Sequence, residues 1–175
     1  MPARASSRGF TLVELLVVVA IAGVLAVLAL PSMRDLVMTN RMKTLSLDLY
    51  SSLVLARSEA VKRNAGNISM VQAAGGWQDG WTVCVDANSN GACDSGEEVL
   101  AVGEAADATI AVTTSPVVTI FTYGRDGRLT STASSFRITA GANNYKVPMR
   151  CVDLNASGRP NTRADTNHTD SDGCN

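Results

Sequence analysis

The 175-residue sequence has a single histidine, His168, which lies in a polar stretch of Asp, Asn, Thr and Ser residues. Ser/His/Asp and Cys/His catalytic sites and histidine-rich metal sites need histidines in ordered settings. Neither charge is in excess, because 15 Lys and Arg residues face 16 Asp and Glu residues. We therefore expect no enzyme and no cofactor. The overall charge gives no reason to expect nucleic acid or an anionic membrane surface as a partner.

Other absences bear on the domain organisation. The chain has no internal repeat, no linker rich in Pro or Ser, and no Cys-x-x-Cys pair of the kind that typically binds zinc. The four cysteines therefore favour disulfides, although unpaired thiols or a zinc site remain as alternatives. Without a linker, the part of the chain that follows its N-terminal region is expected to form one unit.

The N-terminal region is strongly apolar. Residues 1–9 are short and basic, with Arg4 and Arg8, and 18 of the 21 residues from Phe10 to Leu30 are apolar. About 20 apolar residues suffice to cross a bilayer as a helix. The run is longer than a signal-peptide core, and no small-residue cleavage site closes it. We therefore expect a single-pass membrane anchor that is retained.

Glu14 is the one charged residue within this apolar run. A carboxylate inside a spanning helix costs about 2–3 kcal/mol near the bilayer centre and less near its edge. Such a residue usually has a partner or a function, and the alternative is that its side chain reaches the interface and serves neither. Glu14 is therefore a candidate functional residue.

The segment Gly9-Phe10-Thr11-Leu12-Val13-Glu14-Leu15-Leu16 resembles the N-terminus of type IV prepilins and type II secretion pseudopilins. The resemblance implies cleavage between Gly9 and Phe10 by the prepilin peptidase, and N-methylation of Phe10. It also implies that Glu14 neutralises the amino group of Phe10 of a neighbouring subunit during assembly, where a buried carboxylate needs a cation. Pro31 occupies the position of a helix-kinking proline in many pilins.

Beyond Pro31, apolar residues recur at spacings of three, four and eight, which predicts a helix with one apolar face from about Thr11 to Arg63, ending near Asn64. After Gly66 the pattern changes to short strands separated by turns. The expected strands are Ile68 to Ala73, Trp81 to Val85, Glu98 to Val102, Thr109 to Val112, Val117 to Tyr123, Ser135 to Thr139 and Tyr145 to Val152. They favour one antiparallel sheet or two small ones against the helix.

A second resemblance concerns the head and rests on four segments: Gly76-Trp77-Gln78-Asp79-Gly80-Trp81, residues 83–91, Glu98-Val99-Leu100, and residues 122–128. Together they resemble the GspH/FimT group of minor pilins and pseudopilins. The implied fold is α+β and pilin-like. The expected divisions are a cleaved leader (1–9), a transmembrane and assembly helix (10–30), its amphipathic continuation (31–65) and a β-rich head with a disulfide-closed C-terminal tail (66–175).

The resemblance implies a minor pilin that joins a tip or priming complex and supports twitching, adhesion or DNA uptake. The expected partners are other minor and major pilins, the prepilin peptidase and the inner-membrane assembly platform. The expected location is the bacterial inner membrane with the head in the periplasm, and then the pilus at the cell surface. An H-type pseudopilin of a type II secretion system is an alternative, and a DNA-binding receptor at the tip is another.

The cysteines allow three pairings, of which Cys84–Cys93 with Cys151–Cys174 is favoured, because each bond then closes a local loop. The second bond would fasten a polar C-terminal tail that has little other means of becoming ordered. Disulfides indicate an oxidising compartment, so the head is expected outside the cytoplasm.

A calcium-loop pattern begins in the first of these loops and extends beyond Cys93. Asp86, Asn88, Asn90 and Glu97, together with Gly91, match D-x-[DN]-x-[DN]-G-x5-E. However, the loop lies between expected strands and Cys93 would bridge it, and Asp, Asn and Gly are common turn residues. We therefore expect a turn without a metal, with calcium as the alternative.

Charge is segregated along the head. Residues 79–107 carry seven acids and no base, and residues 125–163 carry seven bases and two acids. Some FimT-type pilins bind DNA through a C-terminal Gly-Arg-x-Arg motif, whereas this chain has Gly158-Arg159-Pro160-Asn161-Thr162-Arg163, with Asn161 at the second arginine position. The candidate DNA-binding residues are Arg159, Arg163, Arg150 and Lys146. A solvated face or a subunit interface is the favoured explanation.

Overall fold

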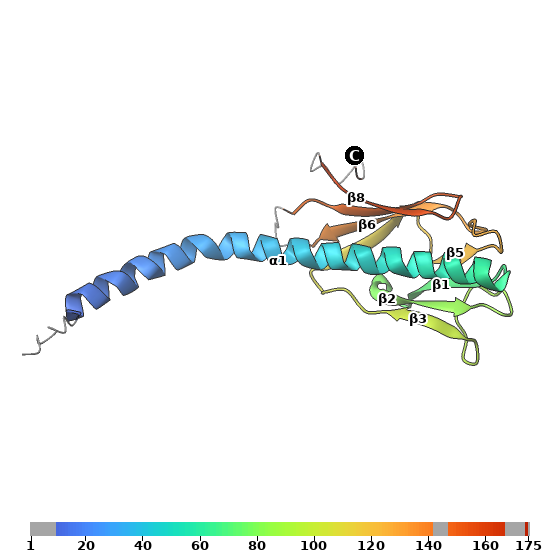
Figure 1. Ribbon diagram of the computed structural model, residues 1–175, viewed down its shortest axis with the longest axis horizontal. Helices are drawn as coiled ribbons and strands as arrows, with labels where there is room; N and C mark the ends of the chain where they lie inside the picture. Colours follow the sequence, from blue (N-terminus) through green and yellow to red (C-terminus); the bar gives the residue numbers. More distant parts are fainter. Residues whose placement is uncertain (1–9, 142–146, 167–173, 175) are drawn as a thin grey trace, which may run out of the picture.

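One long helix, α1 (Leu12–Arg63), runs the length of the molecule in the computed structural model (Figure 1). The structure describes residues 10–141, 147–166 and 174, and for residues 28–31 the backbone only. At 1.5 Å per residue, the 52 residues of α1 span about 78 Å. The first half of α1 projects away from the rest of the protein, whereas the second half lies against the head (Figure 1).

Both ends of α1 carry recognised capping residues. Thr11 is the N-cap, in extended conformation, and its hydroxyl accepts a hydrogen bond from the backbone N–H of Glu14. Asn64 is the C-cap and takes the left-handed conformation (φ 50°, ψ 38°), which asparagine adopts more readily than most residues. The expected helix from about Thr11 to Arg63 is therefore present, with Asn64 ending it.

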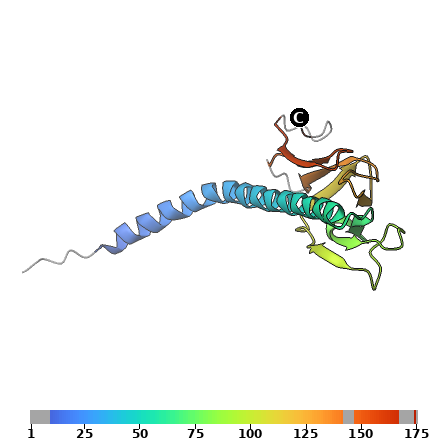
Figure 2. The same cartoon turned by 45° about the vertical axis from the view of Figure 1, so that its right-hand side comes forward.

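The head consists of two four-stranded antiparallel sheets. The first has the strand order β3-β2-β1-β5 and the second β4-β6-β7-β8. The strands are β1 (Ile68–Ala73), β2 (Gly76–Val85), β3 (Val99–Gly103), β4 (Ile110–Ser115), β5 (Ile120–Tyr123), β6 (Ser134–Ala140), β7 (Arg150–Leu154) and β8 (Pro160–Ala164). Figure 2 shows the strands β1 to β3 on one side of α1 and β8 on the other. The predicted α+β fold is confirmed.

The expected and observed strands differ most in the C-terminal part of the head. The strand expected from Tyr145 to Val152 is β7, Arg150–Leu154, and residues 142–146 lie outside the described residues. β8 was not expected, because its sequence Pro-Asn-Thr-Arg-Ala has neither an apolar alternation nor a β-branched run. Its pairing with β7 rests on backbone hydrogen bonds, and its proline is the first residue of an edge strand, where the missing N–H does no harm.

The core lies between α1 and the inner faces of both sheets. Met42, Leu49 and Leu53 of α1 are fully buried, as are Phe121 and Phe136 of the sheets. The rings of Trp77, Phe121 and Phe136 form a cluster with centroids 4.9–5.6 Å apart, and the pair of Trp77 and Phe136 is edge-to-face. This aromatic cluster joins β2 and β5 of the first sheet to β6 of the second.

Two disulfides are present, and their pairing is the one that the sequence favours. Cys84 bonds Cys93 across the loop between β2 and β3, and Cys151 of β7 bonds Cys174. Cys151 and Cys174 are both buried and form a small cluster with Met149, apart from the main core. The second bond therefore attaches the C-terminal end of the chain to the second sheet.

Candidate assembly and binding surfaces

The first half of α1 presents an apolar surface that no other described part of the protein covers. Every described side chain from Phe10 to Val27 is exposed, including Phe10 at 89% and Leu12 at 78%. An uncovered apolar surface of this extent marks a membrane or protein contact. The second half, by contrast, buries one face in the head. α1 therefore has one half that needs an external partner and one half that has an internal one.

The length and hydropathy of a helix decide whether it could span a membrane. Among the described residues, no unbroken straight helix meets both requirements. The segments Leu12–Val27 and Ser32–Arg63 meet them together, as a pair bent by 42°.

Glu14 lies in the first turn of α1 and takes part in a capping box with Thr11. The Glu14 carboxylate oxygen Oε2 accepts hydrogen bonds from the backbone N–H of Thr11 at 3.0 Å and from its hydroxyl at 3.1 Å. The hydroxyl in turn accepts from the N–H of Glu14 at 3.2 Å. A carboxylate in this position also interacts favourably with the positive end of the helix dipole. The spacing Thr-x-x-Glu before an apolar run is the sequence signal of this box, and our sequence analysis missed it.

The other residues of the expected processing site are only partly described. Phe10 is the first described residue and is exposed, and Gly9 lies outside the described residues. Pro31 lies within α1, and its side chain is not described. Cleavage, methylation and the role of Pro31 therefore stay predictions.

The loop that carries the calcium pattern is organised by its own hydrogen bonds. Asp86 is buried, and its carboxylate accepts from the N–H groups of Asn90 and Gly91. The Glu97 carboxylate accepts from the N–H groups of Ala87 and Asp94. The side-chain amides of Asn88 and Asn90 donate to Asp94. Within the described residues, no group of three or more His, Cys, Asp or Glu side chains is arranged to hold a metal. This geometry is that of a hydrogen-bonded turn.

The candidate DNA-binding residues lie on and beside β7 and β8. In the register of the second sheet, Arg163 lies opposite Cys151, which in turn lies opposite Arg137. Arg163 donates from Nε to Asp153 at 2.6 Å, and this ion pair raises the pKa of Arg163. Arg150 is half-buried in β7 and Arg159 is exposed just before β8. Lys146 lies outside the described residues.

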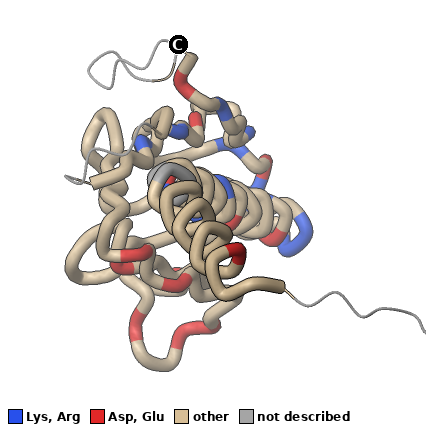
Figure 3. The backbone as a smooth tube through the Cα atoms, turned by 90° about the vertical axis from the view of Figure 1, so that its left-hand side faces the viewer, with Lys and Arg blue, Asp and Glu red and all other residues tan. Residues whose placement is uncertain are grey.

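The charge segregation seen in the sequence is also a segregation in space. In Figure 3, which looks along the molecule from the side of α1's first half, Asp and Glu gather on the side of the first sheet. Lys and Arg gather on the side of the second sheet (Figure 3). The head therefore has an acidic side and a basic side, separated by α1.

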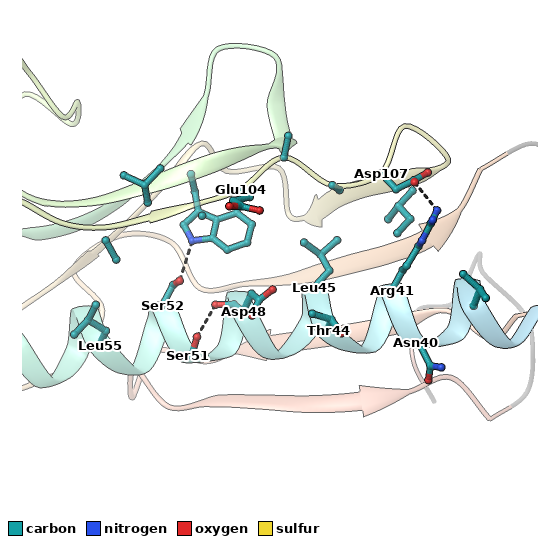
Figure 4. A pocket seen from close by; sticks show the side chains of 18 residues that line it. Asn40, Arg41, Thr44, Leu45, Asp48, Ser51, Ser52, Leu55, Glu104 and Asp107 are labelled. Atoms are coloured by element: carbon teal, nitrogen blue, oxygen red, sulfur yellow. Dashed lines mark hydrogen bonds and ion pairs between the residues drawn. The ribbon is translucent and has the colours of Figure 1, made fainter.

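On the acidic side, a groove of about 1120 Å³ lies between α1 and the segment that follows β3 (Figure 4). Arg41 of α1 forms an ion pair with Asp107 at one end of the groove. The Asp107 carboxyl accepts hydrogen bonds from Thr109 and faces Arg41, and both contacts lower its pKa. Asp48 and Glu104 also line the groove, which makes its lining acidic overall.

On the basic side, a second groove of about 650 Å³ lies between α1 and β8; we call it the α1–β8 groove. It combines three cationic side chains with apolar and aromatic ones. Its lining residues are Tyr50, Val54, Arg57, Ser58, Val61, Lys62, Arg159 and Pro160. Arg57 donates from Nε to the carbonyl oxygen of Gly127, which fixes its side chain between α1 and the β5–β6 turn.

Gly158, which directly precedes the groove residues Arg159 and Pro160, allows the chain to approach the β5–β6 turn closely. Its φ is +74°, in the left-handed region that favours glycine, and a Cβ there would overlap the carbonyl oxygen of Gly127 and lie 3.0 Å from the ring of Tyr123. The close approach places Arg159 beside α1. The Tyr123 hydroxyl is buried without a hydrogen-bond partner among the described residues, and burial raises its pKa.

A long N-terminal helix that begins with a Thr11–Glu14 capping box, has an exposed apolar first half and is followed by a β-rich head defines a pilin-like protein. The family model described as "Type II transport protein GspH" matches residues 46–158. The model described as "Prokaryotic N-terminal methylation motif" matches residues 4–30. The chain belongs to the GspH family, with an N-terminal methylation motif.

Similar proteins agree with this assignment. "Pilin-like protein PilA1" of Thermus thermophilus is 43% identical over 98 residues, which cover 52% of this chain and 56% of the relative. The matched stretch therefore spans about half the length of that relative. The crystal structure of the type IV minor pilin FimU of Pseudomonas aeruginosa superposes with a TM-score of 0.57, covering 74% of this chain and 92% of FimU at 19% identity. A second crystal form of FimU gives 0.54.

The protein is thus a membrane-anchored pilin or pseudopilin of the type IV pilus and type II secretion family, with an N-terminal helix. Proteins of these families are structural and non-enzymatic. The prediction that the chain is not an enzyme is therefore confirmed by its family.

Proposed function

We propose that the protein is a minor pilin that assembles into a type IV pilus and works in its tip or priming complex. The observation that carries the proposal is the divided burial of α1, whose second half is packed in the head while its first half is exposed throughout. A helix of this kind can exchange lipid for the helices of neighbouring subunits without any change in the head. The anchor is then also the assembly interface.

Processing and the first contact follow from the N-terminal residues. The prepilin peptidase cleaves between Gly9 and Phe10 and methylates the new amino group of Phe10. The carboxylate of Glu14 then receives the ammonium group of Phe10 of a neighbouring subunit, since a charge in the apolar fibre interior needs an opposite charge. Both Thr11 hydrogen bonds end on Oε2 of Glu14, and the carboxylate has a second oxygen, Oε1, for this partner.

The proposed location follows from the same features. The precursor resides in the bacterial inner membrane, where the assembly platform receives it, and the head lies in the periplasm before the pilus reaches the cell surface. The two disulfides support this location, because they persist in oxidising compartments. The partners are the other minor pilins and the major pilin.

Substitution of Gly9 tests the proposal. With Gly9→Val, the chain is expected to remain at precursor size and to be absent from sheared surface fibres. Gly66→Ala is the matched control, because the position lies outside the exposed half of α1 and a Cβ there meets no atom within 4 Å. A mature-size Gly9→Val chain on a gel would refute the assignment of the cleavage site.

Glu14→Gln separates processing from assembly. The variant is expected to be cut and methylated like the wild type, because the peptidase acts at Gly9 and Phe10, but to reach the fibre at a level at least about tenfold lower, since it lacks the charge that Phe10 of a neighbour needs. Mass spectrometry of the N-terminal peptide and immunoblots of sheared fibres measure the two effects. Normal incorporation of Glu14→Gln would contradict the proposed contact.

The family match also supports an H-type pseudopilin of a type II secretion system. Deletion of the chain distinguishes the two systems. A minor pilin is required for surface fibres and not for exoprotein secretion, whereas an H-type pseudopilin has the reverse requirement. We favour the pilus because FimU, a type IV minor pilin, matches over 92% of its length.

DNA binding at the pilus tip is a second candidate function, favoured by the alignment of Arg137 and Arg163 on either side of Cys151. Arg150 and Arg159 add charge nearby, and a row of cations suits a phosphate backbone. Filter binding of duplex DNA to the full chain in detergent is the test. Arg159→Ala with Arg163→Ala is expected to weaken binding and to reduce its salt dependence, and Arg34→Ala is the control. A wild-type chain without salt-dependent affinity would contradict this function.

A further inference from the structure

We propose that the groove on the acidic side of the head receives an extended, basic segment of a different pilin subunit. We call it the acidic groove; residues of α1 between Val37 and Leu55 line one wall, and Ala101 to Asp107 line the other. The inference rests on the proposed function as a pilus subunit. It deepens that function by naming a contact surface and the kind of partner that fits it.

The acidic groove is open because the wall opposite α1 is built from small residues. Ala101 and Gly103 of β3 line this wall, as do Ala105 and Ala106 beyond the strand. A Cβ on Gly103 would overlap the ring of Trp81, which also belongs to the lining. The volume of about 1120 Å³ is that of a large ligand pocket. The groove therefore has room for several side chains of a partner.

The two walls carry carboxylates that need a cation. Asp48 of α1 and Glu104, which follows β3, are both exposed and line opposite walls (Figure 4). Within the described part of the chain, neither of these carboxylates has a cationic partner, whereas Asp107 pairs with Arg41. Like charges on facing walls repel each other, and a cation between them is attracted by both. The groove therefore favours Lys or Arg side chains of an occupant.

β3 offers main-chain groups to the same occupant. It is an edge strand with β2 on one side only, so one row of its backbone groups is available to a partner. Edge strands are commonly protected by proline or charge, as β8 is by Pro160 and Arg163, but β3 has neither in Val-Leu-Ala-Val-Gly. Its pairing with β2 skips Leu100, which leaves residues 101–103 as the regular part of the edge. These residues line the groove, so an extended segment can lie beside them.

The occupant that we assign is a different pilin subunit. A second copy of this chain would repeat the contact between unlike surfaces and produce an open array of one protein, which does not suit a minor subunit of a mixed complex. Nucleic acid does not suit the groove either, because its phosphates would face the carboxylates of Asp48 and Glu104. Subunits held together through α1 have a high effective concentration, so the contact can be individually weak.

A peptide probe tests the chemistry of the groove with the full chain in detergent. The probe is a short fluorescein-labelled peptide of alternating Val and Lys, and fluorescence anisotropy should show saturable binding that weakens as salt is added. A peptide of alternating Val and Glu is the control and should not bind. Asp48→Asn with Glu104→Gln is expected to weaken binding of the Val-Lys peptide at least about tenfold. Asp79→Asn with Asp126→Asn removes the same charge outside the groove lining and should leave binding unchanged.

Photocrosslinking tests the contact in cells. The photoreactive amino acid p-benzoylphenylalanine replaces Ala105, which is exposed in the groove lining. After irradiation of membranes and of sheared fibres, we expect crosslinks to a peptide of a different pilin that contains Lys or Arg. The same label at Val117, 87% exposed between β4 and β5, is the control and should not reach that peptide.

Charge reversal makes the crosslink specific for the pairing. Asp48→Lys with Glu104→Lys is expected to lower the crosslink yield at least about tenfold, since like charges would face each other. Replacement of the basic residues of the crosslinked peptide by Glu is expected to restore the yield with the reversed groove. A misfolded groove variant could not give this rescue.

The outcomes are distinct. Absence of peptide binding at about 1 mM, the order of the effective concentration of linked sites, overturns the inference, and so does binding that Asp48→Asn with Glu104→Gln leaves unchanged. Crosslinks only to a second copy, only to proteins other than pilins or to a peptide without Lys or Arg also overturn it, as does the absence of rescue. A labelled chain that enters the fibre without a groove crosslink overturns the contact and leaves the proposed function intact. A wild-type chain absent from fibres contradicts the proposed function, and the peptide probe and the membrane fraction then still decide whether the contact exists.

Discussion

The indole nitrogen of Trp81 donates a 2.9 Å hydrogen bond to the hydroxyl oxygen of Ser52 inside the core. Trp81 is 2% exposed in β2 and Ser52 is 9% exposed in α1, so the bond joins helix and sheet where water does not compete. The pairing also explains how a serine is accommodated on the buried face of α1. A buried indole N–H without an acceptor would cost free energy.

Ser52→Ala should destabilise the head by about 1–3 kcal/mol, because it leaves the Trp81 N–H buried and unpaired. Thermal unfolding of the full chain in detergent, followed by near-UV circular dichroism, measures the effect. Ser51→Ala is the matched control, since Ser51 is exposed and its hydroxyl bonds only a carbonyl of its own helix. Equal midpoints for the two variants would show that the bond contributes nothing.

Gly158→Ala should lower the free energy of unfolding by about 1–3 kcal/mol, because alanine must adopt a φ of +74° and its Cβ meets the Gly127 carbonyl. The same variant should displace Arg159 from α1. Gly66→Ala, where a Cβ meets no atom within 4 Å, should change the unfolding midpoint little. An unchanged midpoint for Gly158→Ala would contradict the close approach.

Acid should weaken the end of α1. Hydrogen bonds from Arg63 lower the pKa of Glu98 below its ordinary value of 4.5, and bonds from Arg63 and Lys62 do the same for Glu59. A lowered carboxyl pKa in the folded state stabilises the protein above about pH 4.5, and this stabilisation is lost as the pH falls through the lower, folded-state value. The difference in melting temperature between wild type and Arg63→Gln should therefore be largest near neutral pH and shrink below pH 4.5. Lys43→Gln, exposed on the same helix, should show no such change.

Calcium should not alter the stability of the oxidised head. The carboxylates of Asp86 and Glu97 already accept hydrogen bonds from four backbone N–H groups of their own loop. A cation would have to break some of these bonds to be coordinated. Melting temperatures in excess calcium and in excess chelator are expected to agree. A clear rise with calcium would show that the loop pattern binds the ion after all.

The sequence was informative wherever an apolar pattern or a specific motif was present. The C-terminal limit of α1 was predictable, because the apolar spacing ends at Val61 and turn residues begin at Asn64, and the disulfide pairing was predictable because each bond closes a local loop. β8 could not be predicted, since its pairing with β7 uses backbone groups and leaves no pattern in Pro-Asn-Thr-Arg-Ala.

The α1–β8 groove was equally hidden, because it brings together residues about 100 positions apart. In the sequence pattern, Arg57 and Lys62 are polar positions of an amphipathic helix, and Arg159 is a candidate DNA-binding residue of a basic C-terminal region. Their proximity depends on the turn at Gly158, whose φ no composition or spacing reveals. The capping box of Thr11 and Glu14 is different, because its signature was present and was overlooked beside the apolar run.

The continuity of α1 has a mechanical consequence. Tension applied between the anchor and the head would pass along one ladder of backbone hydrogen bonds, from Leu12 to Arg63. In the second half, the side chains of Met42, Leu49 and Leu53 are fully buried in the core. The load would therefore be distributed over several helical turns and would not fall on one connection. The head would thus resist separation from α1 along several helical turns when the anchor and the head are pulled apart.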